Sequence, residues 1–180
     1  PIPLMFLTAI IVGGLIGMFN GSLVAYAGIS PFVVTLSVVF LAQGLQYLVS
    51  LMTSSYTYLI LPRNISMLGM NPYFQIGICI FVFVGLYILL DHSVFGRRIK
   101  SIGLNINTAK FSGIPVRFYT WLTYTICGIC CALGGIMVTA NEGMARVGSG
   151  ESYLIDSFML PILGNAIFGR FSVQGTLFSS

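Results

Sequence analysis

Charged side chains are scarce in this sequence. Only 7% of the 180 residues are Asp, Glu, Lys or Arg, against roughly 25% in a typical soluble domain. The first 62 residues contain none of these and no histidine, whereas 57% of the whole chain is hydrophobic. So few charges cannot supply the polar surface that a folded chain of this length needs in water. The sequence therefore excludes a soluble globular domain and predicts an integral membrane protein.

Catalytic and cofactor-binding patterns are also missing. The chain has no GxxxxGK[ST] phosphate loop, no HExxH, no GxSxG and a single histidine. It also lacks a pair of carboxylates placed to share a membrane-buried proton. We therefore expect no cofactor, no nucleotide bound by that loop and no enzymatic activity, so that any energy source lies elsewhere.

The four cysteines all lie inside apolar runs, which argues against an extracellular disulfide framework. Cys127 and Cys130 form a CxxC pair, but a second pair and a nearby histidine are missing. We interpret all four as small packing residues and expect no metal site, and a redox or metal pair is the alternative interpretation. The full set is Cys79, Cys127, Cys130 and Cys131.

Four apolar stretches are long enough to cross a hydrocarbon core of roughly 30 Å as helices. A fifth stretch, 153–169, is interrupted every few residues by polar residues, Pro or Gly, which predicts a broken or re-entrant element lining a cavity. A further span is expected to start at 172–180, and both ends of the chain look like cuts through a longer polypeptide. The predicted fold is one all-α polytopic domain over residues 1–180, with complete spans at about 4–26, 31–53, 72–90 and 118–140.

Five of the eight basic residues lie between Arg97 and Arg117. Basic residues collect in the short cytoplasmic loops of membrane proteins, so this cluster predicts topology and not a nucleic-acid partner. The loop 91–117 is therefore assigned to the cytoplasm. Segments 54–71 and 141–152 become external loops.

Small residues recur at helical spacing in two of the predicted spans. Gly13, Gly17 and Gly21 form one stripe of the first span. A second set lies in the fourth span. Such stripes let another helix approach closely, so we predict tight helix packing at these positions. The second set is Gly128, Ala132, Gly134 and Gly135.

Polar residues inside the apolar stretches must face a partner helix or a water-filled cavity. For Thr35, Ser37, Gln43 and Gln46 we expect hydrogen bonds to another helix, with contact to a solute as the alternative. Asp156 is interpreted as a helix-start or interface residue, and a coupling carboxylate is the alternative. The candidates for lining a solute pathway are Asn20, Thr35, Gln43, Gln46, Asp156 and Asn165.

The loop 92–114 reads HSVFGRRIKSIGLNINTAKFSGI. It resembles the signature cytoplasmic loop of the ribose-type (monosaccharide) ABC transporter permeases, approximately HTxxGRxxxAxGxNxxAAxxSGI. The resemblance extends over essentially the whole chain, including ISPFVVTL at 29–36 and the acidic start at 153–156. The chain departs from the family pattern at Thr108, which replaces an alanine, and at Asn165 and Arg170–Phe171, which replace glycines.

In that family the loop forms a short coupling helix that docks on a cytoplasmic ATPase. The resemblance assigns this contact to six residues of the present chain. Their chemistry agrees, because small residues allow close seating, Asn105 and Asn107 can cap a helix, and Ala109 and Ile114 can be buried. The alternative is a plain basic loop whose positive charges only reflect its cytoplasmic side in the membrane topology. The six residues are Gly103, Asn105, Ala109, Ser112, Gly113 and Ile114.

The resemblance implies a multi-pass permease subunit in a bacterial inner membrane, importing a ribose-like monosaccharide or a related polar solute. The implied partners are a cytoplasmic ATPase, an extracytoplasmic solute-binding protein, an identical or different second permease chain, and the lipid bilayer. A permease of the same superfamily for branched-chain amino acids or nucleosides is the first alternative. An ion-coupled secondary carrier is the second.

Overall fold

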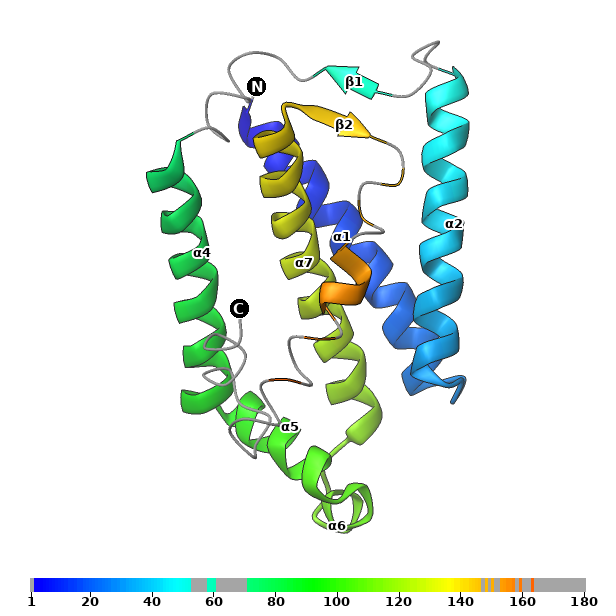
Figure 1. Cartoon of the computed structure of the whole chain (residues 1–180). Helices are drawn as coiled ribbons and strands as arrows, with labels where there is room; N and C mark the ends of the chain where they lie inside the picture. The colour runs from blue at the N-terminus through cyan, green and yellow to red at the C-terminus, as the bar shows by residue number, and fades with distance from the viewer. Residues whose placement is uncertain are drawn as a thin grey trace. The chain divides into compact units, whose positions relative to one another are not determined.

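The computed structural model describes residues 2–52, 58–60, 71–146, 148, 150, 153–157, 159 and 163. The chain divides into two compact units, Pro1–Ala145 and Arg146–Ser180. The first unit holds four long helices (Figure 1): α1 (Ile2–Ala25), α2 (Pro31–Met52), α4 (Pro72–Tyr87) and α7 (Val116–Glu142).

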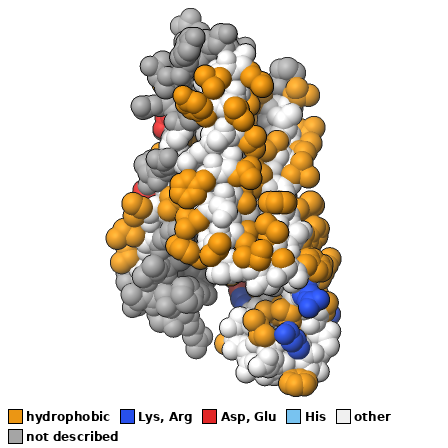
Figure 2. All heavy atoms as spheres, turned by 90° about the vertical axis from the view of Figure 1, so that its right-hand side faces the viewer, with side chains coloured by type: hydrophobic (Ala, Val, Ile, Leu, Met, Phe, Trp, Pro, Cys, Tyr) orange, Lys and Arg blue, Asp and Glu red, His pale blue; other side chains and the backbone are white. Residues whose placement is uncertain are grey.

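Each long helix is apolar and of membrane-spanning length. In the described part of the chain, the stretches that meet both conditions are Leu4–Ala25, Pro31–Met52, Tyr73–His92 and Val116–Glu142. Large apolar side chains project outward along them, as Figure 2 shows for one face, and the Phe81 side chain is 78% exposed. Such exposure is stable where lipid, and not water, is the solvent. The predicted all-α polytopic membrane fold is confirmed.

The closest helix packing joins α1 and α7. A Cβ atom added to Gly13 would lie 2.5 Å from the Ala132 Cβ, and one added to Gly17 would lie 2.5 Å from the Tyr124 carbonyl oxygen. Gly128 faces Gly13 in return. The predicted small-residue packing is therefore confirmed for these positions. Gly134 and Gly135 do not take part, because no described atom lies within 4 Å of a Cβ at either site.

The connection from α1 to α2 follows the predicted break. Gly28 has φ of 70°, a left-handed conformation that glycine adopts without steric cost. Pro31 is the first residue of α2, where its missing N–H removes no hydrogen bond. The two helices are thereby separated by one short turn.

The third and fourth spans extend further than their apolar runs suggest. After α4 the chain continues through a π-helical turn, η1 (Ile88–His92), so the helical segment ends two residues after Leu90. The next long helix, α7, begins at Val116 directly after Pro115, and it ends at Glu142, followed by the C-cap residue Gly143, whose φ is 68°. Backbone geometry at proline and glycine sets both ends of α7, independently of hydropathy.

Short strands occur in the segments expected to be irregular loops. β1 (Tyr58–Ile60) pairs with β2 (Met144–Arg146) in a two-stranded sheet. The strands are 84 or more residues apart in sequence, and local sequence patterns do not reveal pairing over such a distance. The rest of 54–70 lies outside the described residues.

In the second unit, residues 153–157 are helical, and the Ser157 hydroxyl donates to the Leu154 carbonyl at 2.8 Å. Asp156 is exposed within this turn. Most of the predicted broken element, 153–169, lies outside the described residues. The same holds for the expected start of a span at 172–180.

Candidate functional site

Two short helices make up most of the basic loop between α4 and α7. They are α5 (Val94–Leu104) and α6 (Ile106–Phe111), and they lie at the end of the long helices where Figure 2 shows the Lys and Arg side chains. Ser93 caps α5 by accepting a hydrogen bond from the Gly96 N–H at 3.1 Å. This cap satisfies one of the N–H groups that a helix start leaves without a partner.

Asn105 joins the two short helices. Its Oδ1 accepts hydrogen bonds from the N–H groups of Asn107, at 2.9 Å, and Thr108, at 3.2 Å. Its own N–H donates to the Ser101 carbonyl oxygen at 3.2 Å, which closes the last turn of α5. The prediction that Asn105 caps a helix is confirmed. The prediction for Asn107 is wrong, because Asn107 is the second residue of α6 and contributes its backbone N–H to the cap of Asn105.

Gly113 ends α6 in a Schellman motif. Its φ is 74°, its N–H donates to the Lys110 carbonyl at 3.0 Å, and the Ile114 N–H donates to the Ala109 carbonyl at 3.1 Å. This pair of hydrogen bonds needs a left-handed residue at Gly113. The Ser-Gly-Ile sequence therefore has a structural role, which is to turn the chain from α6 toward α7. Ser112 adds a hydrogen bond from its hydroxyl to the Thr108 carbonyl at 2.9 Å.

The exposed apolar surface of this segment differs from the predicted one. Ala109 is only 3% exposed, so its side chain is already covered within the chain and is not available to a partner. Leu104 and Phe111, which are not among the six predicted contact residues, are 88% and 93% exposed. Ile106 between them is 51% exposed. We call Leu104, Ile106 and Phe111 the apolar tip.

The remaining predicted contact residues are accessible to a partner or stabilise the local backbone conformation. Gly103 is exposed near the end of α5, with no described atom within 4 Å of an added Cβ. Ile114 is half-buried, and Ser112 is exposed next to Gly113. The six residues thus lie within one short segment, but they divide into a buried residue, a cap, a helix stop and accessible positions.

α5 is attached to the long helices on both sides. On one side Gly96 is buried against the end of η1, where an added Cβ would lie 2.0 Å from the Leu90 carbonyl oxygen. An exposed ion pair between Lys100 and Asp91 lies beside this contact. On the other side Arg98 donates a hydrogen bond to the Tyr119 hydroxyl of α7. The loop is therefore folded and is attached both to the end of the α4–η1 segment and to α7.

The pathway candidates do not form one cluster in the described residues. In α1, Asn20 has a buried Oδ1 without a hydrogen-bond partner in the described part of the chain. Thr35 of α2 donates to its own helix, to the Pro31 and Phe32 carbonyls at 3.0 and 3.2 Å. Ser37 does the same with Val33 at 2.8 Å. The expected interhelical hydrogen bonds of Thr35 and Ser37 are thus wrong, because each hydroxyl is satisfied within α2.

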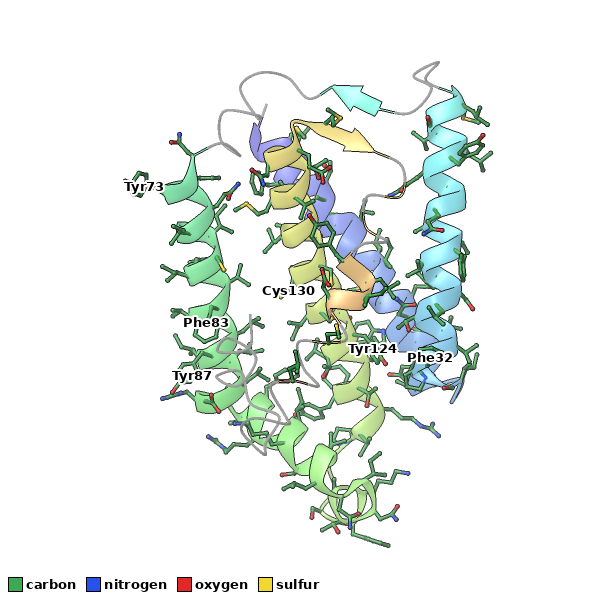
Figure 3. All side chains as sticks on the ribbon, in the orientation of Figure 1. Phe32, Tyr73, Phe83, Tyr87, Tyr124 and Cys130 are labelled. Carbon is green, nitrogen blue, oxygen red and sulfur yellow. The ribbon has the colours of Figure 1, made fainter. Side chains whose placement is uncertain are left out.

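The other candidates are more dispersed. Gln43 is half-buried and Gln46 is exposed on α2. Asp156 belongs to the second unit, and Asn165 lies outside the described residues. Among the described residues no group of three or more His, Cys, Asp or Glu could hold a metal ion. Cys130 lies midway along α7 (Figure 3), well away from the basic loop.

Comparison with known families adds the decisive observation. The model of the family described as "Branched-chain amino acid transport system / permease component" matches residues 1–180, the full length of the chain. The chain belongs to this permease family. It is a transport-permease sequence in a membrane protein.

Individual permeases of known assignment are similar over nearly the whole chain. The autoinducer 2 import system permease protein LsrD of Salmonella typhimurium is 29% identical over 94% of the chain and 53% of the relative. The D-allose transport system permease protein AlsC of Escherichia coli is 30% identical, covering 94% and 52%. The fructose import permease protein FruG of Bifidobacterium longum is 30% identical, covering 100% and 58%. The chain thus spans about half the length of the curated relatives it matches, and no solved structure matches it.

In this permease, the apolar tip lies outside the predicted contact residues, although the sequence carries a signal for it. Leu104 and Phe111 are large apolar residues in a loop otherwise rich in polar and basic residues. Along α5 the half-buried apolar positions are Phe95, Ile99 and Ile102, spaced at i, i+4 and i+7. Leu104 lies outside that stripe, so its exposure was available as a signal from helical periodicity.

Proposed function

We propose that this chain forms the membrane-spanning part of a permease that imports a sugar or related small polar solute across a bacterial inner membrane. A separate cytoplasmic ATPase drives the import, and an extracytoplasmic binding protein delivers the solute. Membership of the permease family, the four apolar helices and the folded basic loop support this function. The basic residues favour a cytoplasmic position for that loop.

The apolar tip is the observation that carries the ATPase assignment. Two side chains that are 88% and 93% exposed are costly in water, since burying one large apolar side chain is worth roughly 1.5–3 kcal/mol. The tip is also held in a fixed geometry, because Asn105 and Gly113 order the two ends of α6. An ordered apolar projection on the aqueous side of the spans suits a groove on a protein partner. We assign that groove to the ATPase.

Transport then requires two alternating arrangements of the spans. Each nucleotide state of the ATPase binds one arrangement of the α5–α6 segments of two permease chains better than the other, and this differential affinity shifts the population. The residues of this chain contribute linkage and pathway, with no covalent chemistry. The second permease chain can be identical to this one or different.

The solute class rests on the relatives. Their names specify autoinducer 2, D-allose and fructose, which favours a sugar or a similar polyhydroxylated solute. The description of the family itself favours branched-chain amino acids as the second candidate. Uptake by the complete transporter of labelled D-allose, D-fructose and L-leucine separates the two. Dependence on ATP, and not on an ion gradient, separates both from an ion-coupled carrier.

Co-purification with the co-expressed ATPase in mild detergent tests the proposal. Leu104→Gln and Phe111→Gln remove the two most exposed apolar side chains of the apolar tip and keep its backbone, and we expect at least a roughly tenfold loss of bound ATPase, since about 1.4 kcal/mol corresponds to tenfold. Thr108→Gln, at an exposed polar position of the same helix, is the matched control and keeps the ATPase. Phe111→Leu, which keeps an apolar side chain, retains most of the binding.

Two results would contradict the assignment. In the first, wild-type permease fails to retain the ATPase. In the second, the Gln variants at the tip retain it as well as Thr108→Gln does. Thermal unfolding of every variant, monitored in the same detergent, verifies that a loss of binding does not come from loss of folding.

A further inference from the structure

One aromatic side chain connects the basic loop with the base of α7. Tyr119 lies in the first turn of α7 and is 9% exposed. The Arg98 guanidinium donates to its hydroxyl, and the guanidinium carbon lies 5.5 Å from the centre of its ring. The Phe95 ring packs on it from the same helix as Arg98, with ring centres 5.7 Å apart. Tyr119 therefore accepts a charge-assisted hydrogen bond from Arg98, and its ring is in contact with the Arg98 guanidinium and with the Phe95 ring.

The helix that carries Tyr119 is in turn joined to α1 over much of its length. Gly13 and Gly17 contact α7 at backbone distance. Closer to Tyr119, the Trp121 Nε1–H donates to the Ser22 hydroxyl of α1 at 3.1 Å. Closely packed glycine stripes leave no side-chain layer that could absorb sliding. A displacement of Tyr119 is thus a displacement of α7 together with α1.

We propose that Arg98 and Tyr119 form a latch that makes α5 and α6 move with α7, so that a push of the ATPase on the apolar tip reaches the α1–α7 pair. This inference rests on the proposed function. Arg98 and Tyr119 act as positioning residues, because their effect on transport passes through α7. The Lys100–Asp91 ion pair is a further attachment of α5, toward η1, between side chains that are 57% and 33% exposed, and exposed pairs contribute little.

The neighbouring arginine provides a matched control. Arg97 is exposed on α5, and its side chain forms no hydrogen bond or ion pair with the described residues. Both arginines add the same positive charge to the same loop and have the same effect on topology. If Arg98 served topology alone, Arg97→Met and Arg98→Met would behave alike. The latch predicts that they differ.

Distance measurements between spin labels test this without knowledge of the solute. Labels are attached at Lys110→Cys on α6 and Asn141→Cys near the far end of α7, in the complete transporter with its native cysteines replaced. The distribution of distances between the two labels is compared without nucleotide and with ATP plus orthovanadate. With the latch intact, α6 and α7 move together, and the distance distribution stays the same. In Arg98→Met and Tyr119→Leu, we expect ATP with orthovanadate to shift or broaden it.

Further variants separate the parts of the latch. Tyr119→Phe loses the hydroxyl acceptor and keeps the ring, so we expect a smaller change than in Tyr119→Leu. Arg97→Met stays like wild type. A wild-type distance that changes with nucleotide would overturn the latch, as would Arg98→Met spectra that match those of Arg97→Met. Failure of the proposed function is a different outcome, in which the unmodified permease never retains the ATPase.

Discussion

Gly128 of α7 lies so close to Gly13 of α1 that a Cβ atom on Gly128 would be 2.3 Å from the Gly13 carbonyl oxygen. Real Cβ atoms do not approach an oxygen this closely, so any side chain at Gly128 forces the two helices apart. The obstacle is backbone, and it cannot rotate away as the end of a flexible side chain can. The α1–α7 pair therefore depends on the absence of side chains at these positions.

Replacing Gly128 with alanine should separate α1 from α7. We expect Gly128→Ala to destabilise the permease by about 1–3 kcal/mol, the usual cost of overpacking. Gly134→Ala is the matched control in the same helix, because no described atom lies within 4 Å of the new Cβ. Thermal unfolding in detergent compares the two. Equal unfolding temperatures would show that the close contact does not hold the helices together.

The left-handed conformation of Gly113 gives a second test. Gly113→Ala should cost roughly 1–2 kcal/mol, because the Cβ atom disfavours this conformation. Gly113→Asn should cost less, since asparagine tolerates it better. Gly103→Ala, on an open helical position of the same segment, should instead stabilise by up to about 1 kcal/mol through helix propensity. The measurement is the unfolding temperature, and a loss of similar size at both glycines would contradict the Schellman role.

Hydropathy and glycine spacing predict much of this fold, because both are local properties of the chain. Four apolar runs long enough to cross a bilayer became four long helices, and the glycine stripe of α1 lies at a helix contact. The partner of that stripe was not predictable in detail. Gly128 and Gly134 look alike in sequence, yet only Gly128 faces α1, because the crossing of two helices selects which residues meet.

The candidate site was predictable as a segment but not residue by residue. Asn105 was recognisable as a cap from its residue type and from the helical residues that follow it. The exposure of Phe111 beside the covered Ala109 was not predictable, because helix α6 has only six residues, too few for a periodic pattern to mark its buried face. Tyr119 gave no signal in sequence, since its partner Arg98 is 21 residues away on another helix.

The two asparagines of α5–α6 should respond differently to alanine. Asn105→Ala removes the acceptor of two backbone N–H groups, and we expect a loss of roughly 0.5–2 kcal/mol, as for other N-caps. Asn107→Ala should change stability very little, because the side chain of Asn107 has no capping role. Asn105→Asp, which keeps the oxygen acceptor, should restore most of the loss. Hydrogen exchange of the α6 amides measures the effect locally.

Asn20 offers a test that separates stability from transport. Its buried Oδ1 lacks a partner in the described residues, and an unsatisfied buried acceptor costs about 1–3 kcal/mol. Asn20→Leu removes that acceptor at similar volume, so we expect stability to stay the same or rise. If Asn20 lines the pathway and accepts a hydrogen bond from solute hydroxyls, uptake of D-allose or D-fructose should fall in the same variant. Ser37→Ala is the control, because the Ser37 hydroxyl is satisfied within α2, and it should leave uptake unchanged. A variant Asn20→Leu that loses stability and transport together would place the asparagine in helix packing instead.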